Sequence, residues 1–431
     1  MATLSIILFL LIIGLSLYDE KVQPGLLAIA AALFVALVVG GWGYAETIAL
    51  FPTSLFLTLA GILLFFGAAV ANGTITNLVN WMLSGIPAHP AIIPFAISGG
   101  VVALTAIGVG NIGATAILAP AGMAIAHRLN LNPFLMILLI VGAANAGALS
   151  PLAVTGVTVR DLLNNRILDY GSMDVRAFGL RLFVLSFIIQ TLISFAGFFL
   201  LGGLRWVRSA TRAELSSATV TWNRDQKLTL VCIGGFVLTI LIGSLPVFDR
   251  DSEFARWGSQ IAAVSFAWLS IMLITKAAEA RAMIKTVPWS SIMMVTGIVM
   301  YIEVASRAGA IEALTRIISM VASEALLPLL VFAFGALLSV FSSSSAVVMP
   351  LFVALAPGLA TATTSAAELV TGVGISAHLV DTSPLSSLGA LCIAAAQHHG
   401  PTEGLFRKLL LWALLMVPIG ALISWGLAEL L

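Results

Sequence analysis

An otherwise apolar run of the chain is interrupted by Gly108-Val-Gly-Asn-Ile-Gly-Ala-Thr-Ala-Ile-Leu-Ala-Pro120. Three glycines, one asparagine and one threonine fall within these residues. Glycine permits tight turns and lets a ligand approach the backbone closely, and Asn111 and Thr115 add hydrogen-bonding groups where lipid offers none. Turns at membrane depth are tolerated only where protein or a water-filled cavity covers them. The stretch therefore predicts a re-entrant hairpin whose tip, near Asn111, contacts a bound solute.

The second half of the chain repeats this arrangement. Val340–Pro350, which reads Val-Phe-Ser-Ser-Ser-Ser-Ala-Val-Val-Met-Pro, lies 230 positions after Gly110–Pro120. Asn145–Pro151 is matched by His378–Pro384 at an offset of 233. Further upstream, four residues recur at an offset of 236: Pro52, Gly61, Gly73 and Ile75 match Pro288, Gly297, Gly309 and Ile311. Paired apolar segments that glycine and proline break in two repeats are typical of the binding site of a secondary transporter.

The composition is that of a membrane protein. The chain has 431 residues, of which 60% are hydrophobic and 9% charged, whereas about 25% are charged in soluble domains. The net charge of +1 argues against a nucleic-acid partner. Cys232 and Cys392 both lie in apolar spans, so we expect neither a disulfide framework nor a cysteine metal site. The HExxH, P-loop and GxSxG patterns are absent from the sequence, and we expect neither an enzyme nor a cofactor.

Apolar runs of about 20 residues predict the membrane spans. We expect an all-α polytopic membrane protein with about ten spans and two hairpins, and we interpret residues 2–18 as a retained first span rather than a signal peptide. We expect scaffold helices within 1–49, followed by a first repeat over 50–203 that contains a hairpin at 91–126 and a broken helix at 132–162. A cytoplasmic linker at 204–227 and further scaffold helices within 228–287 come next. The second repeat, over 288–431, contains a hairpin at 327–358, a broken helix at 366–395 and a last helix at 407–430.

Basic residues orient these spans in the cytoplasmic (inner) membrane. One loop carries Arg205, Arg208, Arg212, Arg224 and Lys227, and a loop two crossings later carries Lys276, Arg281 and Lys285. Both loops are cytoplasmic under the positive-inside rule, and the loop at 249–256 between them is external. Counting crossings from these loops sends the helix after Pro52 inward and the helix after Pro288 outward. We therefore expect two inverted repeats.

Polar groups gather at both predicted hairpin tips. Hydroxyls and backbone amides at the N-termini of half-helices suit an anion, because unpaired N–H groups and the helix dipole favour negative charge. Packing of membrane helices through small polar residues is the alternative interpretation of the same residues. We expect the solute to be bound by the tips and by the prolines of the two helix breaks: Asn111, Ile112, Gly113, Thr115, Ser342, Ser343, Ser344, Ser345, Pro151 and Pro384.

The two helix breaks carry a second set of candidates. Asp381 is the only acid in the run 378–396, and an ionisable residue inside the membrane indicates a functional site. His378 lies one helical turn before it, so the two form a proton-titrating pair, a Na⁺ ligand with a positioning partner, or a static lock for the break. The residues expected to couple an ion, Na⁺ or H⁺, are Gly108, Gly110, Asn111, Asn145, Ser150, His378, Asp381, Thr382 and Ser383.

With its two hairpins and two broken helices, the chain resembles the ion-transporter superfamily of divalent-anion/sodium symporters, arsenite pumps and Na⁺/H⁺ antiporters. The likeness is closest to the MatC-type dicarboxylate (malonate) carriers, through Gly110–Pro120 and His378-Leu-Val-Asp-Thr-Ser-Pro-Leu-Ser-Ser-Leu-Gly389. It extends over about residues 45–430. The resemblance implies an elevator mechanism, in which hairpins and broken helices carry solute past a scaffold, and it implies a homodimer.

The tips depart from the symporter pattern. The symporters carry Ser-Asn-Thr there, which binds both carboxylate and sodium. The first tip of this chain keeps only Asn111, and the second offers Ser342–Ser345 without an asparagine. Coupling to Na⁺ and coupling to H⁺ therefore both stay open.

The expected function is import of a small dicarboxylate of the malonate or C4 type, coupled to Na⁺ or H⁺, by a multi-pass carrier surrounded by lipid. One alternative is a cation/proton antiporter in which Asp381 exchanges the ions and no organic anion binds. Another is an inorganic-anion transporter of the same superfamily, and a passive channel is also compatible with the hairpins. A membrane enzyme would need a nucleophile–base pair or a metal set, and the sequence has neither spacing.

Overall fold

The protein is all-helical in the part of the chain that the structure describes. This part of the computed structural model comprises residues 1–18, 22–84, 91–171, 173–209, 221–243, 257, 260–321, 323–397 and 404–428. All regular elements in these ranges are helices, and they contain no strand. The expected all-α class is therefore confirmed. Residues 210–220 of the predicted linker and the predicted external loop at 249–256 lie outside the described ranges.

The first half of the chain forms helices of very different length. In order they are α1 (Ala2–Tyr18), α2 (Pro24–Leu33) with the π-helical η1 (Phe34–Val39), α3 (Tyr44–Ile48), α4 (Thr53–Ala71), α5 (Thr74–Ser84), α6 (Ile93–Leu104) with η2 (Thr105–Val109), α7 (Asn111–Arg128), α8 (Pro133–Ala148), α9 (Val154–Asn165), η3 (Ile167–Tyr170), α10 (Val175–Phe198) with η4 (Phe199–Gly203), and α11 (Leu204–Ser209).

The second half has the same succession of long and short helices. In order they are α12 (Arg224–Gly243), α14 (Ile261–Ile274), α15 (Ala280–Thr286), α16 (Trp289–Arg307), α17 (Ala310–Val321), α18 (Leu327–Phe341), the π-helical η5 (Ser344–Val348), α19 (Met349–Leu359), α20 (Ala366–Leu379), α21 (Ser387–Gln397) and α22 (Leu405–Ala428).

The helices α4 and α16, which the sequence places 236 positions apart, have the same backbone plan. Pro52 precedes α4 with φ −76° and ψ 73°, and Pro288 precedes α16 with φ −76° and ψ 72°. Each helix is followed by a glycine with positive φ, Gly73 at +76° and Gly309 at +82°. A backbone with φ in this range suits glycine because a Cβ atom would strain it. From these glycines the short helices α5 and α17 leave, and α17 is bent by 81° from α16.

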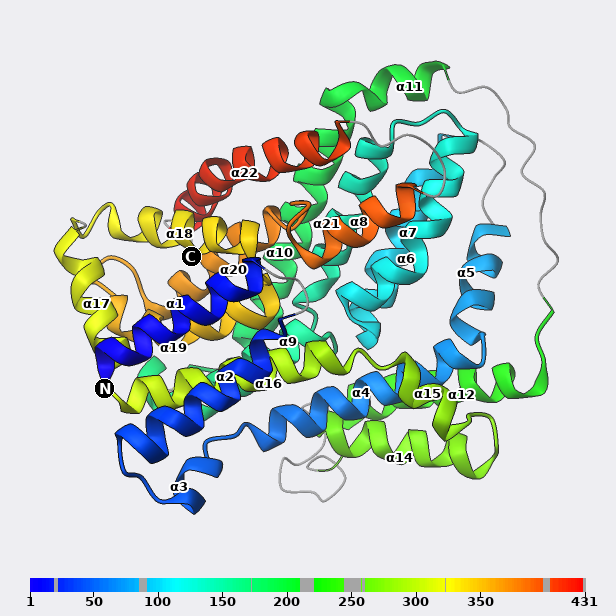
Figure 1. Cartoon of the computed structure of the whole chain (residues 1–431). Helices are drawn as coiled ribbons and strands as arrows, with labels where there is room; N and C mark the ends of the chain where they lie inside the picture. The colour runs from blue at the N-terminus through cyan, green and yellow to red at the C-terminus, as the bar shows by residue number, and fades with distance from the viewer. Residues whose placement is uncertain are drawn as a thin grey trace.

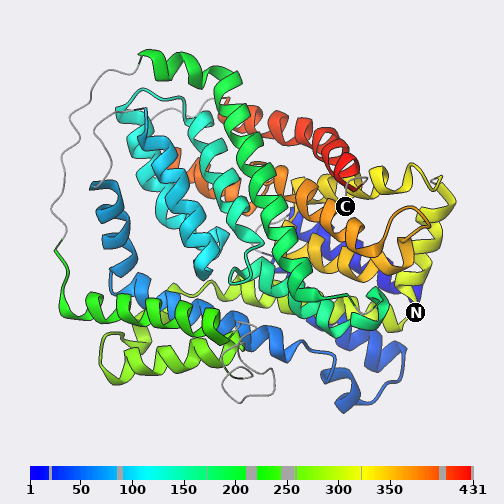
Figure 2. The ribbon, with the colours of Figure 1, turned by 180° about the vertical axis from the view of Figure 1, so that it is seen from behind.

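The helices α2, α4, α14 and α16 run along one side of the molecule, with α12 and α15 beside them (Figure 1). α2 packs along α16, and α14 packs along α4. Gly25 and Gly297 let the backbones of α2 and α16 touch, because a Cβ on either glycine would overlap the other helix. α6, α7 and α8 lie together on one side of Figure 1, and α18 and α20 on the other. Figure 2, the view from behind, shows α10 crossing the face that is nearest the viewer. α10 packs against α8 and α20.

By length and composition, three helices in the described ranges are long and apolar enough to cross a membrane. They are Thr53–Ala71, Val175–Arg208 and Leu405–Leu427, and the bent pair of α16 and α17 would make a fourth. The other apolar helices have 10–17 residues. About ten spans were expected, and the count by helix length is lower because the hairpin arms, the halves of the broken helices and three predicted scaffold helices are each shorter than 18 residues.

Candidate functional site

The first hairpin turns at two glycines. α6 continues into η2, the chain turns through Gly108 and Gly110, and α7 begins at Asn111 and packs against α6. Gly108 has φ +119° and Gly110 has φ +83°, which L side chains rarely adopt. A Cβ on Gly108 would also lie 2.8 Å from the ring of Phe66. The turn therefore needs glycine for its backbone conformation and for its close approach to α4.

The second hairpin turns at serines instead. α18 ends at Phe341, Ser342 is extended, and η5 begins at Ser344 before passing into α19. The Ser343 side chain accepts a hydrogen bond from the backbone N–H of Ala346 over 3.2 Å. This satisfies one of the donors that every helix leaves free in its first turn. The serine cluster thus starts a half-helix at the tip.

Each helix break is tied to the hairpin of its own half. α8 ends at Ala148 and α9 begins at Val154, and α20 ends at Leu379 and α21 begins at Ser387. In the first break Ser150 donates its hydroxyl to the carbonyl oxygen of Ala106 over 2.7 Å. In the second break Ser383 donates to the carbonyl oxygen of Val340, also over 2.7 Å. In both halves the serine before the break proline therefore holds the chain to the arm that leads into the tip.

A polar pocket lies between the two tips and the second break. Its empty volume is about 280 Å³, with its opening included. It is lined by Asn111, Ile112, Ser342, Ser343, Ser344, Ser345, Asp381, Ser386, Ser387 and Leu388. Asp381 is the one charged side chain among these lining residues. Hydroxyls and one amide supply the remaining side-chain polarity, so the pocket offers many hydrogen bonds and no fixed positive charge.

Three helices begin at this pocket in the described part of the chain. α7 begins at Asn111, η5 begins at Ser344 and continues into α19, and α21 begins at Ser387. All three of these first residues line the pocket. The first turn of a helix carries free N–H groups and about half a positive charge from the helix dipole. Helix N-termini that converge on one pocket therefore favour an anion without a basic side chain.

Asp381 is held by hydroxyls at the edge of the pocket. Its carboxyl group is buried, and its two oxygens accept hydrogen bonds from Ser339 of α18 over 3.2 Å and from Ser344 over 2.7 Å. Ser386 donates its hydroxyl to the backbone carbonyl oxygen of Asp381. A buried carboxylate away from water is costly unless hydrogen bonds or a cation compensate its charge. The carboxyl group is therefore in a position to take up a proton or a small cation.

Two hydrogen bonds join the two halves of the chain around the pocket. The hydroxyls of Thr155 in α9 and Ser345 at the second tip are 2.7 Å apart. Asn145 in α8 donates its side-chain amide to the carbonyl oxygen of His378 in α20 over 2.7 Å. The breaks and the tips thus form one connected polar network.

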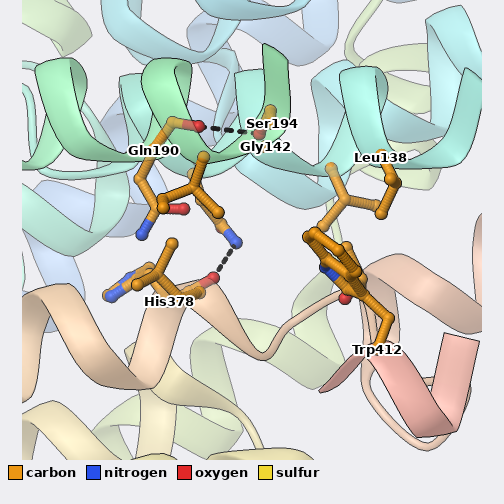
Figure 3. A pocket seen from close by; sticks show the side chains of 11 residues that line it. Leu138, Gly142, Gln190, Ser194, His378 and Trp412 are labelled. Atoms are coloured by element: carbon orange, nitrogen blue, oxygen red, sulfur yellow. Dashed lines mark hydrogen bonds between the residues drawn. The ribbon is translucent and has the colours of Figure 1, made fainter. Parts of the chain in front are cut away.

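A second, smaller polar cavity lies on another side of the breaks, between α8, α10, α20 and α22. Figure 3 shows Gln190 and His378 on one side of it, with Leu138 and Trp412 on the other. Three buried polar atoms of its lining residues have no hydrogen-bond partner among the described residues: Asn145 Oδ1, His378 Nε2 and Thr382 Oγ1. His378 Nδ1 contacts the carbonyl oxygen of Gly374 over 2.6 Å. Because a carbonyl only accepts, Nδ1 carries the hydrogen in this contact.

The structure brings together only part of the predicted solute site. Asn111, Ile112 and Ser342–Ser345 line the pocket. Gly113 lies in α7 outside the lining, and the hydroxyl of Thr115 is buried with no partner in the described structure. The two break prolines, Pro151 and Pro384, also lie outside the lining, the first exposed and the second buried.

The predicted pairing of His378 with Asp381 is not formed. α20 ends at Leu379, so the helical turn that would align the two side chains is interrupted. Asp381 is bonded to serines at the solute pocket, while His378 is bonded to Gly374 and lines the second cavity. Thr382 also lines the second cavity. The other expected coupling residues, Gly108, Gly110, Ser150 and Ser383, shape the turns and breaks.

Sequence reasoning missed several residues of the site. Ser339 is a lone serine in an apolar helix, which carries no signal of its own. Ser386, Ser387 and Leu388 follow the second break directly and were quoted in the resemblance motif without a role. Their position after a helix break, where a new helix must begin, could have indicated that they face the same pocket as the tips.

Two comparisons with known proteins find similarities to transporters. Residues 1–148 match the family model described as the N-terminus of the dicarboxylate carrier protein MatC. The fold is similar to that of the YdaH transporter of Alcanivorax borkumensis, with a TM-score of 0.57, 16% sequence identity, and coverage of 92% of this chain and 88% of that chain. No curated protein matches the chain in sequence.

In both comparisons the chain is similar to transporters and not to enzymes, and three helices of its described part are long and apolar enough to cross a membrane. More particularly, its first 148 residues confirm the resemblance to the dicarboxylate carriers of the MatC type.

Proposed function

We propose that the protein imports a small dicarboxylate by secondary active transport, with Na⁺ or H⁺ as the coupling ion. The observation that carries this proposal is the convergence of three helix N-termini and six serines on one pocket without a basic side chain. Such a pocket suits a carboxylate, because hydroxyls and free backbone N–H groups donate hydrogen bonds to it. The match of residues 1–148 to a dicarboxylate carrier model supports the same substrate class.

The negative charge of Asp381 explains why a dicarboxylate would need a cation in order to bind in the pocket. A dicarboxylate that enters the pocket meets the negative charge of this buried side chain, and two like charges in a site of low polarity repel strongly. Binding a proton or Na⁺ at Asp381 removes this repulsion. Solute and cation then bind best together, which is the physical basis of coupling.

The elevator mechanism is part of this proposal. The bonds Asn145–His378 and Thr155–Ser345 support motion of the tips and breaks as one body, because they join the two halves around the pocket. The layer of α2, α4, α14 and α16 would be the scaffold (Figure 1). We also propose the two inverted repeats, the inner-membrane location and the homodimer that the sequence resemblance implies.

The test is uptake of labelled malonate or succinate into proteoliposomes under separate Na⁺ and H⁺ gradients. We expect saturable uptake, counterflow, and stimulation by at least one gradient. Absence of binding and uptake for all diacids of three to five carbons would overturn the proposal. Flux that does not saturate, without counterflow, would indicate a channel instead.

A cation/proton antiporter is the second candidate, because Asp381 is the one acid that lines the pocket. In that case Asp381 would carry protons and cations in turn, and no organic anion would bind. Cation-driven proton release from proteoliposomes without diacid would favour this function.

A further inference from the structure

The two hairpin arms share matching features at a constant offset in the sequence. α6 and α18 each begin with an apolar residue followed by proline, and Pro328 lies 234 positions after Pro94. The two matching serine bonds accept at Ala106 and Val340, which are also 234 positions apart. The tips that follow differ in length, because Pro350 lies only 230 positions after Pro120. The first tip is therefore four residues longer than the second.

The breaks align equally well. Ser150 and Ser383, which donate the two matching bonds, are 233 positions apart. Gly156 and Gly389 are separated by the same number of positions, and a Cβ on either would overlap the carbonyl group of Ser150 or Ser383 respectively. The same close contact at the same register shows which residues occupy corresponding places.

In this register the two breaks differ at the position that carries charge. The counterpart of Asp381 is Ala148, and both residues are buried. The counterpart of Ser339, which donates to Asp381, is Thr105. The hydroxyl of Thr105 is buried and has no hydrogen-bond partner among the described residues. The first half thus keeps the hydroxyl and lacks the acid that it would bind.

We propose that one monovalent cation, Na⁺ or a proton, is coupled to each transport cycle, and that it binds at Asp381. This inference rests on the proposed function. A desolvated cation is held most strongly by a compensating negative charge in a medium of low polarity, and neutral oxygens hold it more weakly. Asp381 supplies it at the second break, and Ala148 and Thr105 leave only neutral groups at the corresponding place in the first.

Charge balance makes the number of cations measurable. At about pH 8 both carboxyl groups of succinate are ionised, because their pKa values resemble those of ordinary side-chain carboxyls. One cation per dianion moves one net negative charge inward in each cycle. An inside-negative potential then slows uptake, whereas two cations would leave uptake insensitive to the potential and three would accelerate it.

The experiment combines binding and flux. Equilibrium binding of labelled Na⁺ to purified protein, and proton uptake in weakly buffered solution on addition of succinate, count the cations per protomer. We expect one cation, a Hill coefficient of about one, and slower succinate uptake at inside-negative potential. Two or more cations per protomer, or uptake that the potential does not slow, would overturn the inference. Binding of one cation without any diacid flux would reject the proposed function while keeping the site, and binding of none would reject the site.

Two substitutions test whether the cation binds at Asp381. Asp381→Asn is expected to abolish the bound cation, and Ala148→Asp is expected to raise the count from one towards two, with Thr105 as the hydroxyl partner of the new acid. Ala148→Asn is the matched control, since it adds the same bulk without charge. An unchanged count in Asp381→Asn would place the cation elsewhere and overturn the inference even if Ala148→Asp failed to fold.

Discussion

The side-chain amide of Asn145 donates to the backbone carbonyl oxygen of His378 over 2.7 Å, and both residues are buried. The bond joins α8 and α20 close to the points where these two helices break. The carbonyl oxygen of His378 also accepts from the backbone N–H of Asp381 over 3.4 Å, and Asn145 adds a donor from the other half. The two halves of the pocket are therefore fixed to each other by a residue that does not line it.

Replacement of Asn145 should weaken this connection. We expect Asn145→Ala to lower the free energy of unfolding by about 1–3 kcal/mol, because a buried hydrogen bond between the two halves is lost. Maximal uptake should fall more than solute affinity does. Thermal unfolding in detergent and uptake kinetics measure the two effects, with the exposed Asn164→Ala as the control. Equal stability of both variants would show that the bond does not hold the halves together.

The bond between Thr155 and Ser345 can be measured by a double-mutant cycle. We expect a coupling energy of about 0.5–1.5 kcal/mol between Thr155→Val and Ser345→Ala, because each single change removes the same hydroxyl pair. Additive effects of the two changes on unfolding would mean that the pair contributes nothing in the protein as purified.

The hairpin tips should determine solute affinity. We expect Asn111→Ala, and the double change Ser343→Ala with Ser344→Ala, each to weaken binding by roughly 5- to 150-fold, since each lost hydrogen bond in such a site is worth about 1–3 kcal/mol. Binding of labelled malonate to purified protein checks this. Ser270→Ala is the control, because this exposed hydroxyl bonds only within α14. Unaltered affinity in properly folded protein would remove the changed residues from the site.

Asp381 should matter for coupling more than for folding. We expect Asp381→Asn to abolish accumulation against a gradient while exchange of solute across the membrane persists, since an amide keeps the shape of the side chain but binds no proton or cation. Asp225→Asn, at the first turn of α12 and outside the pocket, is the control. If the variant still accumulates substrate with normal ion dependence, the side chain has only a structural role.

The first hairpin should tolerate a methyl group in its arm but not in its turn. Gly108→Ala is expected to cost about 1–3 kcal/mol of stability, because the new Cβ meets a positive φ and the ring of Phe66. Gly99→Ala, in the arm α6 with no atom within 4 Å of the new Cβ, should be neutral or stabilising by up to about 1 kcal/mol. Thermal unfolding of both variants tests this, and equal losses would argue against a strained turn.

The places where helices break could be predicted from the sequence for a simple reason. Glycine, proline and clustered serine within apolar runs disfavour a continuous helix at that position, whatever surrounds it. The turn at Gly108–Gly110, the start of η5 at the serine cluster and the breaks before Val154 and Ser387 all follow such local signals.

The direction of individual side chains could not be predicted in the same way. Thr115 lies within the first motif and is buried away from the pocket, whereas Ser339 lies in an apolar hairpin arm, outside the serine motif, and donates to Asp381. The pairing of His378 with Asp381 was predicted from the spacing of an intact helix. It fails because the helix ends between them and the two residues then face different cavities.

The sequence by itself determined the all-α fold class and the four interruptions, because composition and local backbone preference depend only on neighbouring residues. Only the tertiary structure decided that three helix N-termini meet at one pocket, that Ser339 and Ser344 hold Asp381, and that Asn145 reaches His378. The last of these relationships joins residues that are 233 positions apart. Which of many polar side chains meet is set by how the helices pack, and short sequence patterns do not contain that information.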